Sequence, residues 1–252
     1  MTEGFSTTPS PALKGTLHRE KEGVMAKSET AVKAGGNTIP KREVLITPPK
    51  LQTAEFLIVG TAPYVQQAFS QKAREQIKGT QEAGSQSRSK RKREAKDFQE
   101  CYEQSKHHSR EGWIGIPAGA FRAAMISACR LVGFKMTLAK LSVYIEADGF
   151  DRIDGTPLVR ITGEPHYSEH PVRIKDTVDL RARPMWDSGW SAKVRVTFDL
   201  EQFSLQDVGN LMMRVGRQVG IGEGRPDSRN SAGMGWGLFD ISSDEAVAAK
   251  AA

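Results

Sequence analysis

Residues Ala192–Leu200 read AKVRVTFDL and alternate apolar with polar side chains along their whole length. Successive side chains of a β-strand point to opposite faces, so this alternation places the apolar residues on one face. The stretch therefore predicts a strand of an antiparallel sheet whose apolar face covers the core. Lys193 and Arg195 stand on the other face, toward solvent.

Two amphipathic helices are predicted on either side of this strand in the sequence. Pro117 opens a segment with apolar residues three and four positions apart, and Gly133 closes it. The second helix begins at Ser204, with Asp207 completing an approximate capping box. The predicted buried stripes are Phe121, Ala124, Met125, Ala128, Leu131 and Val132 in the first helix, and Leu205, Val208, Leu211, Met212 and Val215 in the second.

Further strands are predicted at 54–60, 141–147, 158–162, 172–180 and 236–241, the second and third of these forming a hairpin. The order strand, helix, several antiparallel strands, helix, strand predicts an α+β fold. We expect a ferredoxin-like antiparallel sheet with extra hairpins, covered on one face by two helices. RNA-recognition modules use the open face of such a sheet, although fold alone does not establish function.

The domain boundaries follow from composition. Residues 1–50 are rich in Ser, Thr, Pro, Gly and Lys and predict a disordered tail, and 242–252 predict a second. The codons of Arg19–Gly23 would be purine-rich like a ribosome-binding site, so Met25 is a candidate native start. Residues 51–241 then form a single domain.

A basic insertion interrupts this domain at residues 71–110, which carry eleven Lys or Arg against six Asp or Glu. We expect helical flanks and a long flexible loop between them. The candidate phosphate contacts in the loop are Arg88, Lys90, Arg91, Lys92 and Arg93. Such contacts give sequence-independent affinity that falls with salt, whereas the alternative is an ordinary solvated charge run.

The overall composition excludes several classes of protein. With 252 residues and 38% hydrophobic content, the chain can bury one core. It contains no uninterrupted apolar run of membrane-spanning length and no secretory pattern, so we expect no membrane association. Cys101 and Cys129 do not form a disulfide framework, which favours a reducing cytoplasm.

A glycine-rich segment follows the second helix, at residues 216–226 and 233–237. It lacks the Gly-Lys-Ser/Thr ending of a phosphate loop and comes after a helix instead of between a strand and a helix. Two interpretations remain open. In the first, the glycines end the helix and let the backbone cross through a crowded region into the last strand. In the second, Gly222 with Arg217 and Arg225 approaches a nucleic-acid backbone.

Trp186 and Trp190 flank a turn at Asp187–Gly189 and are predicted to be partly exposed. Exposed tryptophans stack on bases, although most tryptophans lie in cores or at subunit contacts. Both residues are therefore candidate base-stacking residues, with burial as the alternative.

No catalytic or metal site is predicted. His166 and His170 could belong to a metal cluster, but Pro165 and Pro171 disfavour the helix that this spacing would need, so we expect a polar loop. No Gly-x-Ser-x-Gly nucleophile motif occurs, and Ser127 lies inside a predicted helix. We expect no enzyme activity and no cofactor.

The glycine-rich segment resembles the C-terminal motif of RAMP proteins, the family that includes backbone subunits of CRISPR effector complexes. The matching residues are Gly220, Ile221, Gly222, Arg225, Gly233, Gly235, Trp236 and Gly237. Ile116–Ala124 is similar to a second RAMP pattern, in which Arg122 is the basic residue. The resemblance implies a ferredoxin-like fold and binding of single-stranded nucleic acid, but no catalytic His of the RNA-processing members can be matched.

The whole stretch from Ala54 to Ile241 also resembles small proteins of bacteriophages and prophages. We therefore expect a non-catalytic protein that binds single-stranded RNA or DNA in a bacterial host cytoplasm and self-associates along it. The alternative is a structural protein of a virion or other assembly, acting through protein contacts.

Overall fold

The computed structural model describes residues 46–82, 84, 95–174, 177–228 and 233–242. The chain divides into two units, Met1–Ile46 and Thr47–Ala252, and every helix and strand named below belongs to the second. The two predicted tails lie almost entirely outside the described residues, and the basic run at 88–93 lies wholly outside them.

The protein is α+β, and its larger sheet is antiparallel throughout. Its strands are β1 (Leu51–Gly60), β3 (Gly115–Pro117), β4 (Val143–Ile145), β5 (Gly149–Phe150), β6 (Pro157–Thr162), β9 (Ser191–Asp199) and β10 (Phe239–Ile241). β1 pairs with β9 on one edge and with β10 on the other. Two strands pair with the edge of β9 that faces away from β1. β4 pairs with its C-terminal end, and β6 pairs with its N-terminal end. β6 in turn pairs with β3 and β5.

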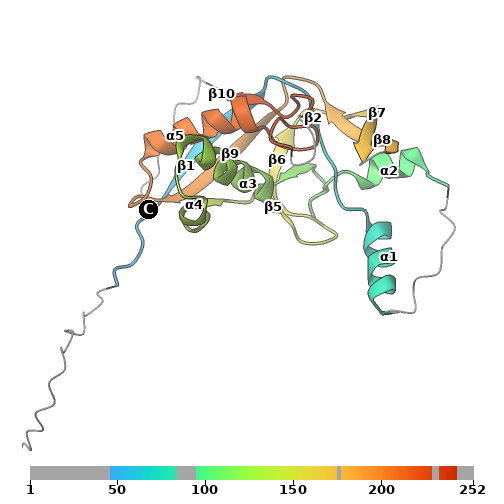
Figure 1. Ribbon diagram of the computed structural model, residues 1–252, viewed down its shortest axis with the longest axis horizontal. Helices are drawn as coiled ribbons and strands as arrows, with labels where there is room; N and C mark the ends of the chain where they lie inside the picture. The colour runs from blue at the N-terminus through green and yellow to red at the C-terminus, as the bar shows by residue number, and fades with distance from the viewer. Residues whose placement is uncertain (1–45, 83, 85–94, 175–176, 229–232, 243–252) are drawn as a thin grey trace, which may run out of the picture. The chain divides into compact units, whose positions relative to one another are not determined.

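The helices are α1 (Gln71–Glu82), α2 (Phe98–Gln104), α3 (Ala118–Cys129), α4 (Met136–Ser142) and α5 (Leu205–Arg214), with a 3₁₀ turn at Arg130–Val132 and a π-helical turn at Val215–Val219. Figure 1 shows α3 and α5 beside each other over β1 and β9, and the core lies between these layers. The predicted capping box is confirmed, since Ser204 and Asp207 bond reciprocally at the start of α5.

The predicted alternation in β9 is also confirmed. Ala192, Val194, Val196 and Phe198 are buried, and Lys193 is exposed. Apolar side chains of α3 and α5 cover these residues, which accounts for the strictness of the pattern in this strand.

A smaller sheet contains β2 (Tyr64–Val65), β7 (His166–Ile174) and β8 (Thr177–Trp186), in the order β2-β8-β7. β7 and β8 form a hairpin, and α2 packs against β8. Asp97 caps α2 by accepting a hydrogen bond from the Glu100 amide. Helices thus flank the basic run on both sides, as predicted, although none of the residues of α1 is buried.

The predicted hairpin between 141–147 and 158–162 is wrong. β6 forms its hairpin with the short strand β5, while β4 pairs with β9 and, in the described parts of the chain, with no other strand. Leu141 belongs to α4, where Ala139 and Ser142 are buried and Leu141 points outward with 71% of its surface exposed. The helical spacing of these small residues places α4 against α3, and the strand begins only at Val143.

Three further expectations need correction. Leu131 and Val132 are half exposed, because α3 ends at Cys129 and the tighter 3₁₀ turn carries them off the buried face. The last strand begins at Phe239 rather than Trp236. The expected polar loop at His166–His170 is part of β7, an edge strand, which tolerates Pro171 without its amide hydrogen.

None of the described helices is both long and apolar enough to cross a membrane. Both cysteines are free thiols, with Cys129 buried in the core and Cys101 partly exposed in α2.

Candidate nucleic-acid interface

The two basic residues predicted on the outer face of β9 are ion-paired. Lys193 Nζ lies 2.8 Å from Glu55 of β1. Arg195 lies 3.3 Å from Glu146 and 2.8 Å from Asp148. These carboxylates oppose phosphate binding on this face, and they come from segments that the linear sequence does not place beside β9.

Arg122 and Arg217 also have local partners. Arg122 donates to the carbonyl oxygens of Lys140 and of Val143, the latter at 2.9 Å, and so closes the end of α4. Arg217 lies 2.6 Å from Asp240 of β10. Contacts of these two residues with nucleic acid stay predictions.

The predicted exposure of Trp186 and Trp190 is wrong, because only 1% and 2% of their surfaces are exposed. Their indole N–H groups donate to the carbonyl oxygens of Gly163 and Ala62. A Cβ on Gly60 would lie 2.1 Å from the Trp190 ring, so glycine there makes room for the indole. Rings enclosed in this way cannot stack on a base.

The glycine-rich segment packs tightly against the core. The amide of Ile221 donates to the carbonyl of Gly237, and the amide of Glu223 donates to Val65. Gly222 has a positive φ, and a Cβ there would lie 2.6 Å from both the Tyr64 ring and the Val65 oxygen. These contacts favour the interpretation of the segment as a crowded crossover.

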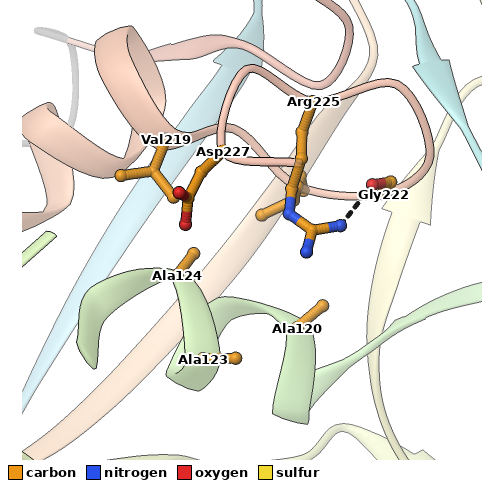
Figure 2. Close-up of a pocket in the computed structure, with 8 residues that line it drawn as sticks. Ala120, Ala123, Ala124, Val219, Gly222, Arg225 and Asp227 are labelled. Atoms are coloured by element: carbon orange, nitrogen blue, oxygen red, sulfur yellow. Dashed lines mark hydrogen bonds between the residues drawn. The ribbon is translucent and has the colours of Figure 1, made fainter. Parts of the chain in front are cut away.

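A small pocket of about 130 Å³ lies between α3 and this segment. Its floor includes Ala120 and Ala123, and Figure 2 shows the Arg225 guanidinium reaching toward α3 beside Ala120. Arg225 donates to the Gly222 carbonyl at 2.9 Å, and Asp227 lies on the opposite wall. The pocket is therefore lined by one cation and by one anion, which is itself ion-paired with Arg130 at 2.8 Å, and it does not gather the predicted basic residues.

A charged cluster joins the smaller sheet to the glycine-rich segment. The Glu223 carboxylate lies 2.7 Å from Arg181 and 3.0 Å from Arg183. His170 lies on the neighbouring strand with only 7% of its surface exposed, and its ring is 5.0 Å from that of Trp236. Neither of its ring nitrogens has a hydrogen-bond partner among the described residues.

This environment makes the stability of the fold sensitive to acid. Burial lowers the pKa of His170 below its usual 6.5, and Arg183 and Arg181 act in the same direction against the Glu223 carboxylate. The unfolded chain then takes up a proton at a higher pH than the folded chain, so stability is complete above pH 6.5 and falls as the pH drops below it. The loss is at most about 1.4 kcal/mol per pH unit.

We expect His170→Leu to reduce this loss. The measurement is urea unfolding of both proteins at about pH 7 and about pH 5.5, on either side of the ordinary histidine pKa. Equal losses in the two proteins would show that other groups control the acid sensitivity.

Solvent-accessible aromatic rings and arginines meet where two loops lie side by side, residues 107–114 and 148–155. The amide of Arg110 donates to the Phe150 carbonyl at 3.0 Å, and the amide of Arg152 donates to the His108 carbonyl at 2.9 Å. We call Arg110, Trp113, Phe150, Arg152 and Arg160 the aromatic–basic surface.

Each aromatic ring of this surface lies beneath an arginine. The Arg110 guanidinium is 6.0 Å from the centre of the Phe150 ring, and that of Arg160 is 6.0 Å from the Trp113 ring. Phe150 is 49% exposed, and all three arginines are exposed. At the margin of the surface, Arg74 of α1 pairs with Asp154 and lies over Phe69.

Among the described residues, three arginine side chains of this surface stand without ion-pair partners, although two carboxylates lie nearby, Glu111 at the Trp113 indole and Asp148 at the backbone amide of Arg160. Within the described parts of the chain, Arg110, Arg152 and Arg160 have no carboxylate within ion-pair distance. Burial lowers the pKa of His108, and the positive charges of Arg152 and Lys106 lower it further. A buried contact also joins the two loops, because His107 Nδ1 lies 2.8 Å from Asp151 Oδ2.

The sequence prediction missed this surface. Trp113 is visible as one of four tryptophans, but Phe150 and Arg152 lie in a segment that reads only as a turn. The closeness of residues 107–114 to 148–155 depends on long-range pairing of β3 and β5 with β6, which has no local signal.

No family model matches the chain, and no curated protein matches it. Among the residues that the structure describes, no group of three or more His, Cys, Asp or Glu is arranged to hold a metal ion.

Proposed function

We propose that this protein binds single-stranded nucleic acid without catalysis, through the aromatic–basic surface. The observation that carries the proposal is the pairing of accessible rings with arginines that lack carboxylate partners in the described chain. Guanidinium groups bind phosphates, and exposed aromatic rings stack on unpaired bases of any sequence. Duplexes keep their bases stacked internally, so the rings favour a single strand.

The strand order supports a ferredoxin-like unit within the larger sheet. β10, β1, β9 and β4 are neighbours in that order, with α3 between β1 and β4 in sequence and α5 between β9 and β10. On this arrangement we propose a RAMP-like protein, and we further propose that it is of phage type and self-associates along the strand in a host cytoplasm. The interface lies at the β3–β5–β6 end of the sheet, because ion pairs occupy the outer face of β9.

The test measures fluorescence anisotropy of labelled single-stranded RNA and DNA at low and high salt. We expect Phe150→Ala to weaken binding about tenfold, the effect of removing one base stack. Arg110→Gln with Arg152→Gln should weaken it similarly. This double variant should also bind with a weaker salt dependence. The slope of the logarithm of the binding constant against the logarithm of salt concentration should fall in magnitude by about 0.7 for each phosphate that is no longer neutralised.

The matched control is Arg214→Gln, which removes an exposed arginine of α5 whose guanidinium donates to Gln218. It should bind like the unaltered protein. A further variant with Arg88 and Lys90–Arg93 changed to Gln measures the contribution of the predicted basic run. Absence of binding to either polymer at low salt would overturn the proposal, and unchanged binding by the aromatic–basic variants would move the interface elsewhere.

An assembly protein is the second candidate function. Leu131, Val132 and Leu141 expose half or more of their surfaces near one another in sequence, and Met136 between them is 38% exposed. Exposed apolar groups of this kind favour protein contacts. Sedimentation would then show self-association that does not change with salt and is abolished in Leu141→Lys.

A further inference from the structure

Glu111 lies beside Trp113 at the aromatic–basic surface, where a carboxylate opposes phosphate binding. Its Oε2 accepts a hydrogen bond from the Trp113 indole N–H at 2.9 Å. Its backbone amide donates to the Ser109 hydroxyl at 3.2 Å. The carboxylate is therefore held at the edge of the indole, and its Oε1 accepts no hydrogen bond from the described residues.

The Trp113 ring is held in a fixed place by two glycines. A Cβ on Gly115 would lie 2.8 Å from the ring and one on Gly149 would lie 2.7 Å from it, so the indole rests against the backbone of β3 and β5. Any larger residue at either position would displace it. The ring is thus a rigid platform, with Arg160 above it.

Arg160 lies over the Trp113 ring at a distance close to the one that an intervening base would require. The guanidinium carbon lies 6.0 Å from the ring centre, whereas a base stacked between them needs roughly 6.8 Å at about 3.4 Å per layer. Arg160 is exposed, so a small outward movement of its side chain opens the space. An inserted base would have its edge next to Glu111.

We propose that Trp113, Arg160 and Glu111 form a subsite for a guanine base, an inference that rests on the proposed function. Guanine presents two adjacent donors on its Watson–Crick edge, N1–H and the 2-amino group, and a carboxylate accepts both. Adenine presents an acceptor beside its amino group, and uracil flanks its single donor with carbonyl oxygens. The carboxylate therefore favours guanine and repels the acceptors of the other two bases.

The experiment compares uridine heptamers whose central nucleotide is guanosine, inosine, adenosine or uridine, by anisotropy at low salt. We expect the guanosine oligomer to bind about tenfold more tightly than the adenosine and uridine oligomers, the lower range for a bidentate base contact. Inosine keeps N1–H and lacks the 2-amino group, so its oligomer should bind with intermediate affinity.

Glu111→Gln should abolish the preference for guanosine while leaving binding of the uridine oligomer equal or stronger. The matched control is Glu103→Gln, another exposed acidic residue, which pairs with Lys106 and should keep the preference. Equal affinity for all four oligomers would overturn the guanine subsite and leave the proposed function standing. Absence of binding to every oligomer would overturn both, and a preference retained in Glu111→Gln would overturn the assignment of Glu111.

Discussion

Replacing Gly237 with alanine is expected to lower the melting temperature by about 10 °C, or to prevent folding. Gly237 has a φ of +69°, and its Cβ would lie 1.8 Å from the Ile221 carbonyl oxygen. Its amide donates to Pro63 and its carbonyl accepts from Ile221, so the backbone cannot move without breaking both bonds. We expect a cost of about 4 kcal/mol, the level at which single substitutions become exceptional.

Gly235→Ala is the matched control, because Gly235 has a similar φ of +76° and no atom of the described residues lies within 4 Å of its Cβ position. It should cost only about 1 kcal/mol, the strain of a left-handed backbone. Thermal unfolding by circular dichroism separates the two costs. If Gly237→Ala folded as stably as Gly235→Ala but no longer bound nucleic acid, the glycine motif would serve the ligand and not the fold.

The sequence predicted those elements whose signal is local. β9 and α5 each bury one regular face, so alternation and helical spacing were sufficient, and the Ser204–Asp207 cap lies within four residues. The glycine-rich segment was predicted with two interpretations, and the contacts of Gly222 with Tyr64 and Val65 favour the structural one.

Side chains with distant partners were not predictable in the same way. Trp186 and Trp190 flank a turn, which suggests exposure, yet the smaller sheet folds their rings onto Tyr64, with ring centres 5.4 and 5.6 Å away. The charges on Lys193 and Arg195 predict a basic face, but Glu55 and Glu146 lie beside them and pair with them. Polar side chains of this kind carry no periodic signal for their partners.

Glu223→Gln is expected to destabilise the fold by about 3 kcal/mol, because it leaves the buried Arg183 and the partly buried Arg181 without their shared carboxylate. The Glu223 side chain is 15% exposed, and those of Arg181 and Arg183 are 20% and 11% exposed. Arg181 keeps contacts with Asp179 at 4.0 Å and with the Gln67 side chain at 3.3 Å, whereas among the described residues Arg183 keeps only the Ser105 hydroxyl and a carbonyl. Most of the cost therefore comes from Arg183.

The matched control is Asp240→Asn, which breaks the exposed pair with Arg217, and exposed pairs contribute about 0–1 kcal/mol. Urea unfolding at neutral pH measures both variants. Changing Arg183 to Met in the Glu223→Gln background should recover part of the stability, since it removes the uncompensated charge. If Glu223→Gln cost no more than Asp240→Asn, water would reach the cluster, and the smaller sheet would not be fixed to the glycine-rich segment by this carboxylate.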